Sequence, residues 1–397
     1  MSAKWSVKTQ LPVHYTVFES FDLFNPENNA LLFDGQNSSQ KSLRRVVIVD
    51  DYVERLHGER IRQYFQYHEI EYRLISLSVS EDNKSMDTVF QVIEELNAFE
   101  VSRRSEPVIA IGGGVLMDIV GLAANLFRRG IPYIRVPTTL LGVVDAAIGA
   151  KTAVNFQGHK NRIGTFYPPL AAILDTTLLE TLSDRQISNG IAEILKIALV
   201  KDAELFELLE NYGAAMLSSK CQNPEAVPII RRSVQGMLED LESNLWEEKL
   251  ERLVDYGHTF CPTLELKAVP KLLHGEAVAV DMAISVMLAY QRSLVTYQEV
   301  ERIYNFMRSV RLPLLHPICT PELLYAALQS TTKHRNGLQR FPLTVGIGAA
   351  QFFHDITYEE IKTAVKAIAQ LEPDAAMQTS PDTLLNGGDP RTQVSSL

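Results

Sequence analysis

The sequence predicts an α/β domain with a doubly wound parallel sheet, followed by an all-helical domain. In the first half, short β-type runs alternate with helical patterns, an order typical of such a sheet. From Ser183 onward, long helical windows replace the strands. We place the α/β domain at residues 1–178, the helical domain at 179–371, and a flexible tail rich in Pro, Gly, Ser and Thr at 372–397.

The elements of the first half follow in a regular order. The strand RRVVIVDD leads into a helix over residues 53–68, and the strand EYRLISLSVS leads into a helix over 86–104. The run EPVIAIGGG is a third strand, and YIRVPTTL and AAILDTTLL extend the series to about residue 178. The helical windows of the second half cover residues 186–200, 203–218, 229–246, 276–294 and 358–371.

Composition and charge argue against several classes of partner. The 397 residues contain no unbroken apolar stretch of about 18 residues and no basic start followed by an apolar run, so we expect a cytoplasmic protein. A net charge of -10 argues against nucleic acid and anionic membranes as partners. The cysteines show no CxxC spacing and are expected to be free thiols: Cys221, Cys261 and Cys319.

A glycine-rich turn after the third strand is a candidate phosphate site. Gly112, Gly113 and Gly114 would let the backbone approach a pyrophosphate, and the helix beginning near Val115 offers unpaired N–H groups. The turn is not a GxGxxG fingerprint, and a tight connection without a ligand is an equal alternative. Asp50, at the end of the first strand, is suited either to bind ribose hydroxyls or to cap a helix.

A second candidate region follows the strand YIRVPTTL and ends at Asn155, and we take it as a loop region. Asp145 and Lys151 stand there among small residues, where poor solvation would make them pair with each other or with a ligand. The cations around this segment predict either a phosphate cradle or a solvated basic face: Arg128, Arg129, Lys160 and Arg162.

Three separated residues are candidates for a metal site. Glu193 and Lys196 share one face of an apolar helix, where a buried carboxylate requires a cation. His258 follows a glycine in DYGHTF, and His274 opens an apolar helix in LLHGEAVA. One Glu and two His with an open position are a typical catalytic zinc set. Spacing alone leaves open the alternative of capping or core histidines beside a buried ion pair.

Six motifs stand in the order found in a known family: GGGVLMD, VPTTLLGVVDAAIGAKTAVN, GHKNRIGTFYPP, ILDTTLLETLSDRQISNGIAEILK, GHTF and LLHGEAVA. From about residue 44 to 350, the chain resembles the sugar phosphate cyclase family, whose best-known member is 3-dehydroquinate synthase. The resemblance implies an NAD-binding α/β domain, a helical metal-binding domain, and a divalent metal, usually zinc with cobalt as the alternative. It also implies a small sugar phosphate as substrate. The two-part organisation of the chain itself predicts that ligands bind in a cleft between the domains.

The resemblance assigns roles to individual residues. The implied metal ligands are Glu193, His258 and His274. The residues at NAD-binding positions are Asp50, Glu81, Lys84, Gly113, Gly114, Asp118, Thr138, Thr139, Lys160 and Thr181. The residues at substrate-contacting positions are Asp145, Lys151, Lys160, Asn161 and Lys196. Arg129 matches a phosphate-binding arginine that reaches the site of the neighbouring subunit, which implies a homodimer.

Three departures from dehydroquinate synthase bear on the substrate. This chain has Asp255 where that enzyme has asparagine, Pro262 where it has histidine, and Met237 where it has lysine. These changes remove donors that would hold a substrate carboxylate, and Asp255 adds an acceptor suited to hydroxyls. They resemble the branch that cyclises sedoheptulose 7-phosphate, and within it the 2-epi-5-epi-valiolone synthases. A region that closes over the substrate in the family matches Lys333, His334 and Arg335.

The implied reaction converts sedoheptulose 7-phosphate into 2-epi-5-epi-valiolone and phosphate. It proceeds by transient NAD-dependent oxidation, β-elimination of phosphate, reduction, ring opening and intramolecular aldol closure. Three alternatives remain: a desmethyl-4-deoxygadusol synthase acting on the same sugar, a 3-dehydroquinate synthase, and a metal-dependent polyol dehydrogenase that would release NADH. The cations of GAKTAVN and KNRIG favour a phosphate-eliminating enzyme over the dehydrogenase, because the developing negative charge requires cations. A further alternative is a catalytically silent protein that retains the fold, and the three proposed metal ligands together with Lys151, Lys160 and Lys196 argue against it.

Overall fold

The computed structural model describes residues 3–9, 11–33, 35 and 44–372, so residues 373–397 of the predicted tail lie outside the described residues. The chain divides into two compact units. The first consists of Met1–Gly190, Ser219–Asn223 and Met237–Trp246, and the second of Ile191–Ser218, Pro224–Gly236 and Glu247–Leu397. Two helices therefore begin in one unit and end in the other: α4 (Asp184–Lys201) and α6 (Ala226–Asn244).

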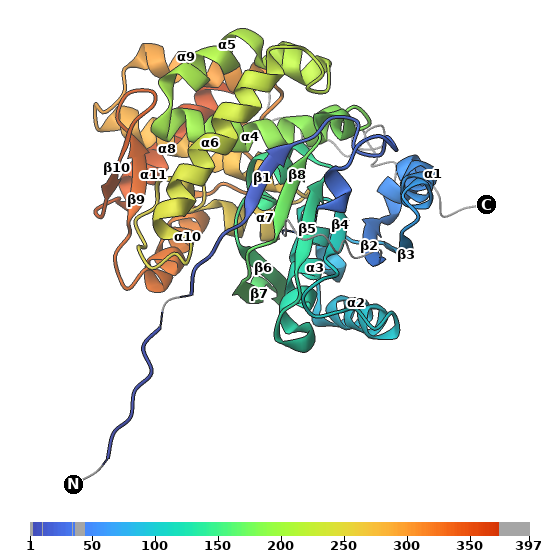
Figure 1. Ribbon diagram of the computed structural model, residues 1–397. Coiled ribbons are helices and arrows are strands. Elements are labelled where there is room, and N and C mark those ends of the chain that lie inside the picture. The colour runs from blue at the N-terminus through green and yellow to red at the C-terminus, as the bar shows by residue number, and fades with distance from the viewer. Residues whose placement is uncertain (1–2, 10, 34, 36–43, 373–397) are drawn as a thin grey trace. The chain divides into compact units, whose positions relative to one another are not determined.

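A six-stranded parallel sheet forms the centre of the first unit (Figure 1). Its inner strands are apolar and buried on both faces, as parallel strands covered by helices are, whereas the two edge strands are partly exposed. The order across the sheet is β1 (Thr16–Glu19), β8 (Ala171–Leu174), β5 (Tyr133–Pro137), β4 (Val108–Gly112), β2 (Arg44–Asp50) and β3 (Glu71–Leu77).

Helices cover both faces of this sheet. They are α1 (Asp51–Tyr67), α2 (Met86–Ala98) and α3 (Gly114–Leu126). On β2, Val46 and Ile48 face the apolar core that α2 and α3 close, whereas Val47 and Val49 face the core that α1 closes. The sheet is therefore doubly wound, and the predicted α/β fold of the first half is confirmed.

A hairpin stands where we took the chain to be a loop region. A π-helical turn over Gly142–Ala146 is followed by β6 (Lys151–Phe156), which pairs antiparallel with β7 (His159–Phe166). The loop prediction is wrong because alternation decides the structure here: Thr152 and Val154 are buried, and β6 packs against α3. Small and polar residues concealed this period-two pattern.

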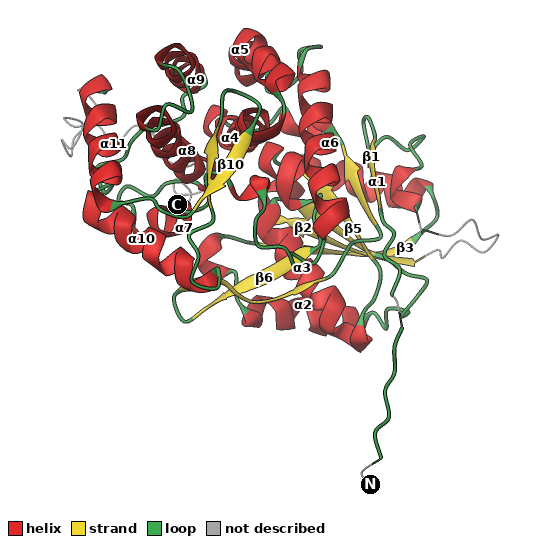
Figure 2. Cartoon of the chain, turned by 90° about the vertical axis from the view of Figure 1, so that its left-hand side faces the viewer, coloured by secondary structure: helices red, strands yellow, loops and turns green. Residues whose placement is uncertain are grey.

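The second unit is mainly helical. Besides parts of α4 and α6, it contains α5 (Ala203–Ser218), α7 (Cys261–Lys267), α8 (His274–Gln291), α9 (Tyr297–Ser309), α10 (Pro321–His334) and α11 (Tyr358–Leu371). The apolar α8 is buried along most of its length and packs against α7, α9 and α11. The prediction of an all-helical second half is wrong at one point, because β9 (Phe341–Thr344) and β10 (Ala350–Phe353) form a hairpin (Figure 2). Four-residue strands are too short for a periodic pattern to reveal.

Short 3-10 helices join several elements, at Ala30–Leu32, Glu81–Asn83, Phe127–Arg129, Thr176–Leu179 and Leu253–Asp255. Among the described residues, none of the helices combines the length and the apolar character needed to cross a membrane. The cysteines are buried and free: Cys221, Cys261 and Cys319.

Candidate functional site

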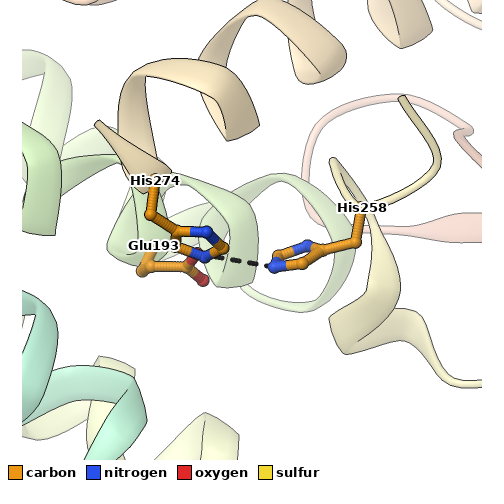
Figure 3. A group of neighbouring side chains, drawn as sticks. All are labelled: Glu193, His258 and His274. Carbon is orange, nitrogen blue, oxygen red and sulfur yellow. Dashed lines mark ion pairs between the residues drawn. The ribbon is translucent and has the colours of Figure 1, made fainter. Parts of the chain in front are cut away.

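Three residues far apart in the sequence meet in the second unit. Glu193 comes from α4, His258 from the turn before α7, and His274 is the first residue of α8. Their ligand atoms all lie within 4.8 Å of one another. The Nε2 atoms of His258 and His274 lie 3.7 Å and 3.2 Å from Oε1 of Glu193, and Figure 3 shows the side chains pointing toward a common centre. The fold therefore supplies the proximity that sequence spacing left open.

Glu193 is buried where a carboxylate requires cations. Its side chain is 1% exposed, and neither oxygen has a well-aligned hydrogen-bond donor within the described chain. Lys196, one helical turn later, lies with Nζ 2.5 Å from Oε2. Because an uncompensated buried charge is strongly unfavourable, this carboxylate is suited to bind a second cation between the histidines.

The surroundings give the three side chains different protonation states. Burial would raise the pKa of Glu193, but Lys196 and the histidines hold it well below its usual range. Burial lowers the pKa of His258 to about 4, and Lys196 adds to that effect. Burial also opposes charge on His274, yet Cys261 and the carboxylates beside the ring raise its pKa well above the usual value. In the metal-free group, these shifts favour the charged form of His274 and the neutral form of His258.

A glycine and a buried carboxylate hold the loop that carries His258. Gly257 has φ +75°, and a Cβ there would lie 2.9 Å from side-chain atoms of α8, so this position requires glycine. Asp281, on α8, accepts hydrogen bonds from the backbone N–H groups of Phe260 and Cys261 at 2.5 and 2.9 Å. Burial raises the pKa of Asp281 to about 6. Helix α8 thus supplies one candidate ligand and anchors the loop of another.

Asp255 is already engaged by two arginines. Its Oδ1 accepts a hydrogen bond from Arg252 at 2.6 Å, and its Oδ2 lies 3.6 Å from the guanidinium of Arg335. A substrate hydroxyl at Asp255 would therefore share a carboxylate that these cations orient. Lys333 is exposed, and the side chain of His334 lies outside the described part of the chain.

Pro262 and Met237, the other two departures from dehydroquinate synthase, fit the helices in which they stand. Pro262 stands in the first turn of α7, where a missing N–H removes no helical hydrogen bond. Met237, on α6, is buried. Neither side chain offers a hydrogen-bond donor.

A polar network in the first unit joins predicted NAD-binding and substrate-contacting residues. Lys84 is 4% exposed, and its Nζ donates to Asp118 Oδ2 at 2.5 Å and to Asn161 Oδ1 at 2.6 Å. Lys160 Nζ lies 3.2 Å from Glu81 Oε1. Burial raises the pKa of Asp118, although Lys84 opposes the shift. Five predicted residues are thus arranged as two neighbouring ion pairs and an amide.

Asn155, which sequence reasoning did not select, links the two pairs. Its Nδ2 donates to Glu81 Oε1 at 2.9 Å, and its Oδ1 accepts from the backbone N–H of Asn161 at 2.9 Å. Its own N–H donates to the carbonyl of Lys84 at 2.8 Å. The signal that could have identified it is its place at the end of GAKTAVN, on the polar side of an alternating strand.

The glycine-rich turn lies at the carboxyl ends of adjacent parallel strands, where ligands bind in open α/β sheets. Gly112 ends β4, Gly113 is the N-cap of α3, and Gly114 is its first residue. A Cβ on Gly112 would lie 2.7 Å from Leu116 and 3.2 Å from Cβ of Asp50. A side chain at Gly112 would therefore crowd Leu116 and Asp50, and the start of α3 has no side-chain cap.

Asp50, Thr138 and Thr139 lie at the same edge and also have structural roles. Asp50 caps α1 by accepting a hydrogen bond from the N–H of Tyr52 at 2.9 Å, which was the alternative to ribose binding. The N–H of Thr138 donates to the carbonyl of Gly112 at 2.9 Å. Thr139 Oγ1 accepts from the first residue of the π-helical turn at 3.1 Å.

Asp145 and Lys151 stand on either side of one turn. Asp145 is half-buried in the π-helical turn, and Lys151 opens β6 with an exposed side chain. The prediction that Lys151 is poorly solvated is wrong, because β6 directs Thr152 inward and the preceding residue faces the opposite side.

A buried arginine holds the backbone between these two residues. Arg135, on β5, is 0% exposed. Its guanidinium donates to the carbonyl oxygens of Ala146 at 3.1 Å, Gly149 at 2.5 Å and Lys151 at 2.9 Å. Sequence reasoning missed Arg135 because a single cation within an apolar strand matches no motif; a charge at a buried strand position was its signal.

Arg129 and Thr181 lie outside both the cluster of Glu193, His258 and His274 and the polar network around Lys84. Arg129 is exposed at the end of the 3-10 helix Phe127–Arg129, with φ +62°. Thr181 is exposed in the turn before α4. An exposed Arg129 is accessible to a second subunit, and that role stays a prediction.

Comparison with known proteins finds similarity along both units of the chain. The N-terminal model of 3-dehydroquinate synthase matches residues 74–189, and the C-terminal model matches residues 190–334. The chain is 50% identical over 377 residues to a 2-epi-5-epi-valiolone synthase from Actinomyces sp, covering 94% of this chain and 99% of that protein. It is 40% identical over 347 residues to a demethyl-4-deoxygadusol synthase from Trichormus variabilis, covering 84% of each.

A solved structure agrees with these matches. The 2-epi-5-epi-valiolone synthase ValA from Streptomyces hygroscopicus subsp. jinggangensis 5008, solved with NAD+ and Zn2+ bound, superimposes with a TM-score of 0.88. It is 48% identical, and the alignment covers 92% of this chain and 100% of that chain. Family models for both halves and these full-length similarities lead to one conclusion. The chain belongs to the 3-dehydroquinate synthase family.

Proposed function

We propose that this chain is a sugar phosphate cyclase that converts sedoheptulose 7-phosphate into 2-epi-5-epi-valiolone and phosphate. The observation that carries the proposal is the 50% identity to a 2-epi-5-epi-valiolone synthase along 94% of the chain. The demethyl-4-deoxygadusol synthase is less similar, at 40%. Asp255, Pro262 and Met237 support a substrate without a carboxylate, because none of their side chains supplies a cation for one.

The residues around Glu193 fit a divalent metal, zinc or alternatively cobalt. Two imidazole Nε2 atoms face a buried carboxylate whose oxygens lack aligned donors within the described residues. One carboxylate and two imidazoles are a typical catalytic zinc set. Glu193, His258 and His274 would hold the ion, which when bound supplies a Lewis acid. Lys196 keeps the carboxylate ionised, and hence ready to bind it.

The glycine-rich turn fits the pyrophosphate of NAD+. The start of α3 has no side-chain cap, so its backbone N–H groups are available to an anion. When bound, NAD+ supplies a hydride acceptor that later returns the hydride. The remaining residues proposed for the cofactor are Asp50, Glu81, Lys84, Gly113, Gly114, Asp118, Thr138, Thr139, Lys160 and Thr181.

Phosphate departure requires cations, and we assign them to lysines and an arginine. Lys151, Lys160 and Lys196 would bind oxygen atoms of the substrate and stabilise the charge that develops as phosphate leaves. Arg129 would bind phosphate in the partner's site of a homodimer. Asp145 and Asn161 would hydrogen-bond hydroxyls, with Asp255 orienting the ketose end. The enzyme would thus be a carbon–oxygen lyase that closes the ring by an intramolecular aldol reaction.

The assay that tests this proposal combines the protein with NAD+, Zn2+ and sedoheptulose 7-phosphate. We expect inorganic phosphate to be released without net formation of NADH, because the hydride returns within each turnover. Phosphate is measured colorimetrically and NADH by its absorbance. Phosphate released from 3-deoxy-arabino-heptulosonate 7-phosphate but not from the heptulose would overturn the substrate, and NADH accumulating from a simple polyol would favour a dehydrogenase.

The second candidate is a demethyl-4-deoxygadusol synthase, which the 40% identical relative supports. Both candidates release phosphate, so the assay above does not separate them. Mass spectrometry and NMR of the product do, and we expect valiolone. A deoxygadusol product would replace the first candidate with the second.

Zinc binding to the metal-free protein is expected to release about one proton near pH 7, because metal ligands bind in their deprotonated form. The proton comes from His274, whose pKa is raised. The lowered pKa values of His258 and Glu193 mean that these groups have already lost theirs. Calorimetry in buffers with different ionisation enthalpies measures this number, which should rise as the pH falls toward the pKa of His258 and decline above the pKa of His274. No proton release at pH 7 would contradict the assignment.

A further inference from the structure

The two nitrogen atoms of the His274 ring face different partners. Nε2 lies 3.2 Å from Oε1 of Glu193, on the side of the proposed metal. Nδ1 lies 3.3 Å from Oε2 of Glu265, on α7. The side chain of Glu265 is 12% exposed, so this contact is largely shielded from water. One ring therefore connects a proposed metal ligand with a second, shielded carboxylate.

The partner at Nδ1 decides which nitrogen can bind a metal. A neutral imidazole carries one proton, and an acceptor at Nδ1 keeps the proton there and leaves the Nε2 lone pair available. At His258 the same arrangement uses a backbone carbonyl, since Nδ1 lies 3.0 Å from the oxygen of Tyr256. His274 differs in that its acceptor is a carboxylate, which is the stronger one.

A second group also lies near Nδ1 of His274. The sulfur of Cys261 is 3.9 Å away, and Cys261, Glu265 and His274 themselves have ligand atoms within 4.8 Å of one another. A thiol is a weak acceptor. Glu265 is closer and charged, and it is the better partner for the Nδ1–H group.

Helix α7 is anchored in a way that fixes Glu265. Its first residue, Cys261, and the preceding Phe260 donate backbone hydrogen bonds to Asp281 of α8, and α7 packs along α8. Glu265 stands one turn further along the same helix. Helix α8 therefore holds the beginning of α7, and α7 returns a carboxylate to the first residue of α8.

We infer that Glu265 is a positioning residue for the metal centre: it fixes the orientation and tautomer of His274 by accepting the hydrogen bond from Nδ1. Carboxylate partners of this kind orient histidine ligands in zinc proteins, and their loss costs about 10–100-fold in metal affinity. The inference rests on the proposed function, because it assumes that Nε2 of His274 binds the metal.

The test measures the Kd of the full-length protein for Zn2+ by competition with a chelator of known affinity. We expect Glu265→Ala to weaken zinc binding by about 10–100-fold. Glu265→Gln, which keeps a neutral acceptor of the same shape, should lose less than the alanine variant. In the cobalt-loaded proteins, the visible ligand-field bands should shift for Glu265→Ala, because the ring is no longer held.

Cys261→Ala is the matched control, since it removes the other group at the same nitrogen. It should bind zinc as the wild type does. Unchanged zinc affinity and cobalt bands in both Glu265 variants would overturn the inference, and so would a loss confined to Cys261→Ala. If Glu265→Ala does not fold, Glu265→Leu takes its place, because leucine keeps most of the volume but has no acceptor, and equal zinc affinity with unchanged cobalt bands in that variant would overturn the inference. A wild-type protein that binds no zinc would overturn the proposed metal centre as well, which distinguishes the two failures.

Discussion

Replacing His258 or His274 by alanine is expected to remove the bound metal and the activity together. Each imidazole supplies one of three proposed ligands, and the remaining pair cannot complete the set. Because loss of an outer partner alone costs about 10–100-fold, loss of a ligand should reduce zinc affinity and phosphate release by more than about 100-fold. Metal content by atomic spectroscopy after gel filtration and phosphate release from sedoheptulose 7-phosphate measure the two effects.

NAD+ binding provides the internal control for these variants. The proposed cofactor residues lie in the first unit and the histidines in the second, so both variants should bind NAD+ with the affinity of the wild type. Full metal occupancy in either variant would exclude that histidine as a ligand. Loss of NAD+ binding together with the metal would instead indicate general misfolding.

Replacing Glu193 by glutamine is expected to lower stability as well as to remove the metal. The substitution leaves the buried Lys196 ammonium without the carboxylate that lies 2.5 Å away. Breaking a buried ion pair from one side costs about 3–5 kcal/mol. Thermal unfolding of the metal-free proteins measures this loss, because chelation removes the contribution of bound zinc from both.

A double variant separates the two roles of Glu193. Glu193→Gln combined with Lys196→Met also removes the buried ammonium that the single variant deprives of its carboxylate, and such replacements of a buried pair are often neutral. The double variant should therefore recover most of the lost stability and still bind no metal. Equal stability of the single variant and the wild type would contradict the ion-pair argument, and metal binding by the double variant would contradict the ligand role.

Periodicity predicted the elements that are long or repeat regularly. The alternation of apolar runs and amphipathic windows predicted the parallel sheet, and the inner strands are indeed apolar and buried. The β6–β7 hairpin was missed because its small and polar residues conceal the alternation, and the β9–β10 hairpin because its strands have four residues each. Packing of β6 against α3 and of β9 against α8 supports these two-stranded sheets. The domain limits 1–178 and 179–371 stay a prediction.

Some residues of the candidate site can be proposed from their sequence motifs, whereas others can be identified only from their neighbours in the structure. Glu193, His258 and His274 could be proposed from their motifs, but their common centre depends on how α4, α8 and the loop before α7 come together. Glu265 and Arg135 were beyond sequence reasoning for the same reason. The roles proposed for Glu265 on α7 and Arg135 on β5 follow from the atoms that these side chains contact, which the sequence does not show. Family and fold are confirmed, whereas the roles of individual site residues stay proposals, as do the homodimer and the cytoplasmic location.

The hydrogen bonds of Arg135 determine which positions of the turn before β6 can be substituted. Its hydrogen bonds reach main-chain oxygens, a group that every amino acid carries. The partly exposed side chains of this turn, such as those of Ala146 and Lys151, can therefore be exchanged while the path of the backbone is retained, whereas Ala147, Ile148 and Ala150 are buried and constrained by packing. Substitutions meant to alter substrate range are therefore best made at the exposed positions of this turn, with Arg135 kept to hold the backbone.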